Sequence, residues 1–176
     1  MLKPAIIYPL TAMIAALCSA CTVPYVAPAS GPVARLRLVD VSPNPDARIS
    51  VFGQPSCNDT PATLTNFGSD SSSVDPVLMQ NLDMPMQVTK KKNTEILIPA
   101  AASYNVRLYA AKSGMGGNGN CIVDVQFSPH ENGNYQIDVA DIWTTCEMKV
   151  FNIEKNDTGT GYIKIPHPGV RPKKCS

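Results

Sequence analysis

Short segments in which apolar and polar side chains alternate recur along this chain of 176 residues. In the segment 121–127, for example, Cys121, Val123 and Val125 share one face, while Asp124 lies on the other. A period of two is typical of a β-strand, whereas an amphipathic helix needs a period of 3.6. Helical periodicity is weak throughout. The alternation predicts strands at residues 34–41, 47–52, 94–99, 103–110, 121–127, 134–140, 146–150 and 161–166.

Turn-forming residues separate these segments, since the chain contains 16 prolines and 11 glycines. The dipeptide Asn132-Gly133 predicts a hairpin between the strands on either side of it. The sequence SPNPD at residues 42–46 likewise separates two strands. Many short strands with frequent turns favour an all-β fold, which we expect to be an antiparallel two-sheet β-sandwich.

Residues 55–93 interrupt the alternation and predict one long early loop. Asp75 followed by Pro76 favours a single helical turn at residues 75–79, with Asp as N-cap. Long loops on a rigid sandwich are where contacts with partners tend to lie.

The N-terminus combines Lys3, a short apolar stretch and small residues, which together are typical of a secretory signal peptide. The apolar stretch is shorter than the ~18–20 residues of a membrane-spanning helix. Its end, Leu17-Cys18-Ser19-Ala20-Cys21, resembles the lipobox of bacterial lipoproteins, although Cys18 stands where that family usually has an aliphatic residue. Ordinary signal cleavage that leaves Cys21 as a free thiol is the alternative.

The resemblance to bacterial lipoproteins implies removal of residues 1–20 and lipidation of Cys21. Diacylglycerol on the thiol and an acyl chain such as palmitate on the amine would anchor the protein to a membrane. Thr22 follows the cysteine in place of Asp, which by resemblance to Gram-negative sorting implies the cell outer membrane, on its periplasmic or surface face. Residues 21–32 contain three prolines and no charge, and they predict an extended lipidated tether before a domain at residues 33–176.

Four cysteines follow the anchor, and an even number in an oxidising compartment predicts two disulfides, for which three pairings are possible. Cys121 and Cys146 both lie on the apolar faces of predicted strands. We therefore predict the pair Cys121–Cys146, which leaves Cys57–Cys175.

Other motifs give weaker signals. The sequence GMGGNG at residues 114–119 has dinucleotide-binding spacing, but a strand follows it where a helix would be required. Met79, Met84 and Met86 could bind Cu(I), although methionines more often fill cores and interfaces. His130 and His167 lie in turn-like contexts without a neighbouring nucleophile or carboxylate at ligand spacing. We predict no catalytic residues, no metal site and no cofactor.

A net charge of +1 without a basic cluster disfavours nucleic-acid binding. The layout of lipobox, tether, strands and one long early loop resembles small β-sandwich envelope lipoproteins such as the type VI secretion lipoprotein. This resemblance implies a non-enzymatic structural or protein-binding module whose partners are the membrane and other envelope proteins. The alternatives are a periplasmic ligand- or copper-binding protein that uses the Met-containing loop, and an envelope hydrolase.

Overall fold

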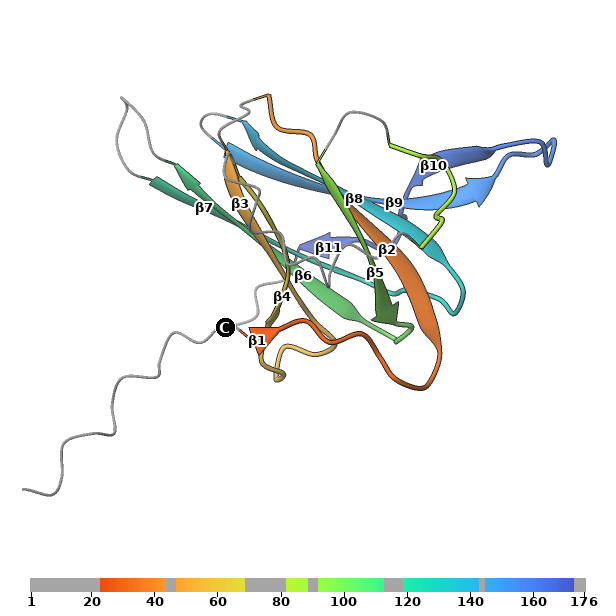
Figure 1. The fold of residues 1–176 in the computed structure, drawn as a ribbon, viewed down its shortest axis with the longest axis horizontal. Coiled ribbons are helices and arrows are strands. Elements are labelled where there is room, and N and C mark those ends of the chain that lie inside the picture. Colours follow the sequence, from red (N-terminus) through yellow and green to blue (C-terminus); the bar gives the residue numbers. More distant parts are fainter. Residues whose placement is uncertain are drawn as a thin grey trace, which may run out of the picture.

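The structure of the protein is a computed structural model that describes residues 23–43, 47–68, 82–88, 92–112, 119–142 and 145–172. Every regular element in these ranges is a β-strand, and the strands form two sheets (Figure 1). Within the same ranges, no helix is long and apolar enough to cross a membrane. The all-β prediction is therefore confirmed.

The first sheet, sheet A, has six strands in the described part of the chain. Their spatial order is β1 (Val23–Pro24), β4 (Ala62–Phe67), β3 (Arg48–Gln54), β6 (Tyr104–Lys112), β7 (Gly119–Phe127) and β11 (Arg171–Pro172). The second, sheet B, has five, in the order β10 (Tyr162–Pro166), β9 (Thr145–Lys155), β8 (Asn134–Ile142), β2 (Val33–Asp40) and β5 (Asn93–Pro99).

All eight strands predicted from alternation are present, but the loop predicted at residues 55–93 is wrong in part because β4 lies inside it. The sequence pattern did not predict β4 because its threonines count as polar residues in a hydrophobic alternation. Thr65 is nevertheless buried, and its hydroxyl lies 3.0 Å from that of Thr94 in sheet B. Pairing two hydroxyls makes their burial tolerable. The helical turn predicted at residues 75–79 lies outside the described residues.

The prediction that all strands are antiparallel is also wrong. β2 pairs with β8 in parallel, with Leu36 beside Tyr135, and β1 pairs with β4 in parallel. The Asn132-Gly133 turn does form, since Asn132 has a φ of 58° and the Gly133 amide donates to the His130 carbonyl. It carries the chain from β7 in sheet A to β8 in sheet B, so the predicted hairpin is replaced by a connection between sheets.

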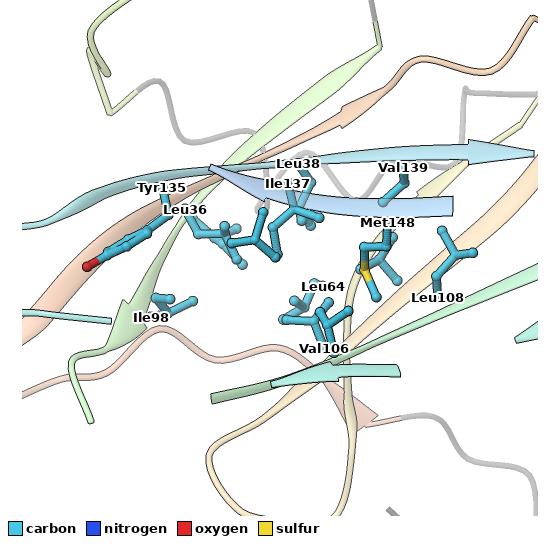
Figure 2. Packing of buried hydrophobic residues seen from close by; sticks show 14 of the residues in the cluster. Leu36, Leu38, Leu64, Ile98, Val106, Leu108, Tyr135, Ile137, Val139 and Met148 are labelled. Atoms are coloured by element: carbon cyan, nitrogen blue, oxygen red, sulfur yellow. The ribbon is translucent and has the colours of Figure 1, made fainter. Parts of the chain in front are cut away.

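The hydrophobic core fills the space between the sheets (Figure 2). A shared set of fully buried aliphatic side chains comes from both sheets: Leu36, Leu38, Ile98, Ile137 and Val139 from sheet B, and Leu64, Val106 and Leu108 from sheet A.

The predicted disulfide Cys121–Cys146 is present and joins β7 of sheet A to β9 of sheet B, with a Cα–Cα distance of 6.0 Å. Both cysteines pack against the core, as their place on the apolar strand faces predicted. Cys57 is also disulfide-bonded. Its predicted partner Cys175 lies outside the described residues, so that pairing stays a prediction.

Candidate functional site

A buried ion pair lies on the face of sheet B that points away from the core. Arg37 of β2 and Glu95 of β5 are neighbours in the strand register, and Arg37 Nη2 lies 2.7 Å from Glu95 Oε1. Alternation placed Arg37 on the polar face of its strand, which predicts exposure. Its side chain is only 2% exposed, because residues 82–88, hereafter the covering segment, pack over it.

The ion pair directs its remaining hydrogen bonds to the covering segment. The Arg37 guanidinium donates to three successive carbonyls, those of Met84 (3.0 Å), Pro85 (3.1 Å) and Met86. Glu95 Oε2 accepts a 2.9 Å hydrogen bond from the Leu82 amide. Four hydrogen bonds therefore tie one short piece of chain to the outer face of the sheet.

The covering segment adopts a backbone conformation that needs this support. Asp83 and Met86 have φ angles of 48° and 60°, in the left-handed region that side chains with a Cβ disfavour by roughly 1–2 kcal/mol each. The Met84 side chain is buried at 3% exposure, whereas Met86 is 41% exposed. The result is a short, fixed loop that presents Met86 to solvent.

The same geometry bears on the copper hypothesis. A Cu(I) site formed by neighbouring thioethers needs their sulfurs together and accessible. Met84 is buried while Met86 is exposed, so these two side chains do not form an open site in this conformation. Met79 lies outside the described residues. In the part of the chain that the structure covers, no three His, Cys, Asp or Glu side chains are grouped as metal ligands.

Polar contacts continue across the outer face of sheet B toward β10. Asp138 Oδ2 accepts a 2.6 Å hydrogen bond from Lys164, and Asp138 Oδ1 accepts one of 2.7 Å from Gln136, which is the register neighbour of Arg37. The Lys164 ammonium also lies 4.1 Å from the centre of the Phe151 ring. This network orders the face beside the covering segment.

The two histidines singled out in the sequence do not enter this site. His167 packs against the rings of Phe127 and Tyr135, with ring centroids 5.7 Å and 5.8 Å away. Burial lowers the pKa of His167, as expected for an imidazole held among aromatic rings. The backbone amide of His130 donates to the Tyr135 hydroxyl. Both histidines thus lie around one aromatic cluster at the edge of the core.

Residues 114–118 of the glycine-rich sequence at 114–119 lie outside the described residues, and only Gly119 is described. β7 begins at Gly119, so a strand follows the glycines as predicted. A helix N-terminus that could hold a pyrophosphate does not follow them, which argues against a dinucleotide site.

Sequence reasoning missed Arg37 and Glu95 as a pair. The available signal was a carboxylate inside the otherwise aliphatic segment TEILIP, since a charge in such a segment needs a partner when it is buried. The partner could not be identified, because the register of β2 against β5 is not visible in the sequence.

Comparison with models of protein families gives no match for this chain, and comparison with curated proteins gives no significant match either.

Proposed function

We propose that the protein is an exported, lipid-anchored module of the bacterial cell envelope that binds another envelope protein through its covering segment. This proposal rests on one observation: the hydrogen bonds of the buried Arg37–Glu95 pair hold the covering segment in place. A buried ion pair adds little net stability, because desolvation offsets the attraction between the charges. Here its hydrogen bonds hold a loop with two disfavoured φ angles in one conformation.

A loop that is ordered before binding loses less conformational entropy when a partner docks. An exposed apolar side chain on a fixed loop is also the kind of anchor that protein interfaces use, and methionine is enriched at such interfaces. The covering segment offers both features through Met86. The function we propose is therefore protein binding, without catalysis and without a cofactor.

The proposed location rests on the N-terminal sequence and on the disulfide. A signal peptide at residues 1–20, cleaved before Cys21, supports export and lipidation, and Thr22 supports the outer membrane. The Cys121–Cys146 disulfide fits an oxidising compartment. Cys21 itself lies outside the described residues. Mass spectrometry of the mature N-terminus is the direct test, and a mature protein with an unmodified Cys21 would contradict the anchor.

Binding through the covering segment can be tested by site-specific photocrosslinking in the native host. A photoreactive phenylalanine replaces Met86 in one variant and Ile122 in the other; Ile122 is a matched control because it is an exposed aliphatic residue on sheet A. We expect a discrete protein adduct at position 86 that is absent at position 122. The same adducts at both positions, or none at position 86, would refute the proposal.

A second variant tests whether binding depends on the fixed conformation of the covering segment or only on its amino-acid sequence. Arg37→Met combined with Glu95→Leu removes the hydrogen bonds to the covering segment but leaves its sequence unchanged. We expect the adduct at position 86 to be lost or strongly reduced in this background. An undiminished adduct would show that the ion pair plays no part in binding.

A further inference from the structure

The N-terminal segment lies against the sandwich from its first described residue. Val23 and Pro24 form β1 and pair with Ala62 and Thr63 at the start of β4. Tyr25 then packs against the core, and its hydroxyl donates to the Leu97 carbonyl of sheet B. The tether expected at residues 21–32 is therefore fastened to both sheets by residues 23–25.

The direction of β1 determines where the chain enters the domain. β1 runs parallel to β4, so the residues before Val23 approach from the end of the sandwich where β4 begins. We call this the entry end. Figure 1 shows β1 there, with the chain running along that end before it turns into β2. Four connections border it, at residues 29–32, 55–61, 100–103 and 128–133.

The surface around β1 is apolar and nearly uncharged. Val23 is 45% exposed and Val26 is 79% exposed, whereas the other valines that the structure describes are buried or half-buried. Among the four bordering connections, Asp59 and Glu131 are the only charged residues. Such a surface has few charged side chains that could pair with a charged partner, but its exposed apolar side chains favour contact with the interfacial region of a bilayer.

Covalent geometry limits the distance between this surface and the proposed anchor. Thr22 is the only residue between Cys21 and Val23. Two residues of extended chain span at most about 7 Å, which is about the thickness of the headgroup region of one leaflet. A lipidated Cys21 therefore cannot hold the domain away from the membrane while β1 remains paired.

We infer that the entry end of the sandwich docks directly on the lipid surface, with Val23 and Val26 in the interfacial region of the bilayer. This inference rests on the lipid anchor of the proposed function. The anchor and the paired β1 together fix which end of the domain faces the membrane. The contact is apolar, so it needs no anionic lipid and is insensitive to salt.

Quenching of tryptophan fluorescence by brominated lipid tests this orientation. The full-length lipoprotein is produced in its host and reconstituted in zwitterionic phosphatidylcholine vesicles, with Trp143→Phe as background. Val26→Trp places the reporter at the entry end. Ile142→Trp is the matched control, because Ile142 is exposed and ends β8 at the opposite end of the sandwich.

We expect brominated vesicles to reduce the fluorescence of the Val26→Trp protein to about half or less, and to leave the Ile142→Trp protein nearly unchanged, because bromine quenches only residues at bilayer depth. Equal quenching of the two proteins would overturn the docking. Mass spectrometry of the same samples separates the two proposals. A lipidated protein without differential quenching refutes the docking alone, whereas an unlipidated mature protein refutes the anchor and the docking together.

Lengthening the chain between Cys21 and Val23 tests whether this short connection is the cause of the docking. A flexible insertion of about 12 Gly and Ser residues between Thr22 and Val23 spans roughly 20 Å on average and frees the domain from the surface. We expect the quenching of the Val26→Trp protein to fall to the level of the Ile142→Trp protein. Unchanged quenching would overturn the short connection as the reason for docking.

Discussion

Removing the two members of the Arg37–Glu95 pair separately and together gives the sharpest test of its role. Arg37→Met leaves the Glu95 carboxylate, whose side chain is 10% exposed, without its guanidinium. Breaking a buried pair from one side costs about 3–5 kcal/mol of the free energy of unfolding. Glu95→Leu leaves the Arg37 guanidinium uncompensated, with a similar expected cost. Independent effects would therefore add to roughly 6–10 kcal/mol.

The double variant Arg37→Met/Glu95→Leu removes both charges, so no buried charge is left unpaired. What it loses is the set of hydrogen bonds to the covering segment. These number four, three from Arg37 and one accepted by Glu95, at a net value of about 1 kcal/mol each. We expect the double variant to lose no more than about 4 kcal/mol, less than the sum of the single variants by at least 2 kcal/mol.

Urea denaturation with fitted m-values measures these free energies, and amide hydrogen exchange of residues 82–88 reports whether the covering segment is released. Lys149→Ala is a suitable control, because its ion pair with Glu147 is exposed and should change stability by about 0.5 kcal/mol or less. If the double variant lost as much as the two single variants combined, or if exchange in the covering segment were unchanged, the role assigned to the pair would be refuted.

Three further predictions concern the core and its edges. Replacing Cys121 and Cys146 by Ala removes a crosslink between residues 25 apart, and urea denaturation should show a loss of about 3–4 kcal/mol in the chain-entropy model; a loss below 1 kcal/mol would contradict it. Gly53→Ala should lower the melting temperature, because a Cβ there would lie 2.5 Å from the Tyr104 hydroxyl; unchanged melting would show that the ring can move. Burial raises the pKa of the Tyr25 hydroxyl from 10.0 to about 12, so the folded state retains this proton more strongly than the unfolded state. The stability this provides is present below pH 10 and is lost as the pH rises toward 12, and Tyr25→Phe should reduce that loss in alkaline unfolding curves.

The strands were largely predictable because the signal for a strand is local. A half-buried strand needs only alternate apolar residues, and eight segments carry that pattern in order along the chain. β4 was not predicted because its threonines count as polar in such a pattern, although Thr65 is buried against Thr94. β1 and β11 escaped because two residues are too few to show any alternation.

The candidate site was predictable only as a region. The interruption at residues 55–93 and its methionines indicated a binding loop, and the covering segment does lie within it. The ion pair that holds it was not predictable, because Arg37 lies 58 residues from Glu95 and 47 from Met84 in the chain. Nothing local distinguishes Arg37 from Arg35, which occupies the same face of the same strand.

The sequence by itself determined the positions of eight of the strands and the faces on which Cys121 and Cys146 lie, since each depends on residues within a few positions of one another. The tertiary structure decided which strands are neighbours: β2 lies parallel to β8, and the Asn132-Gly133 turn joins two sheets instead of closing a hairpin. It also decided that Arg37 is buried and that β1 is fastened to β4. The physical reason is that alternation specifies which side of a strand is apolar, whereas the neighbour of each strand depends on how all the apolar faces together exclude water.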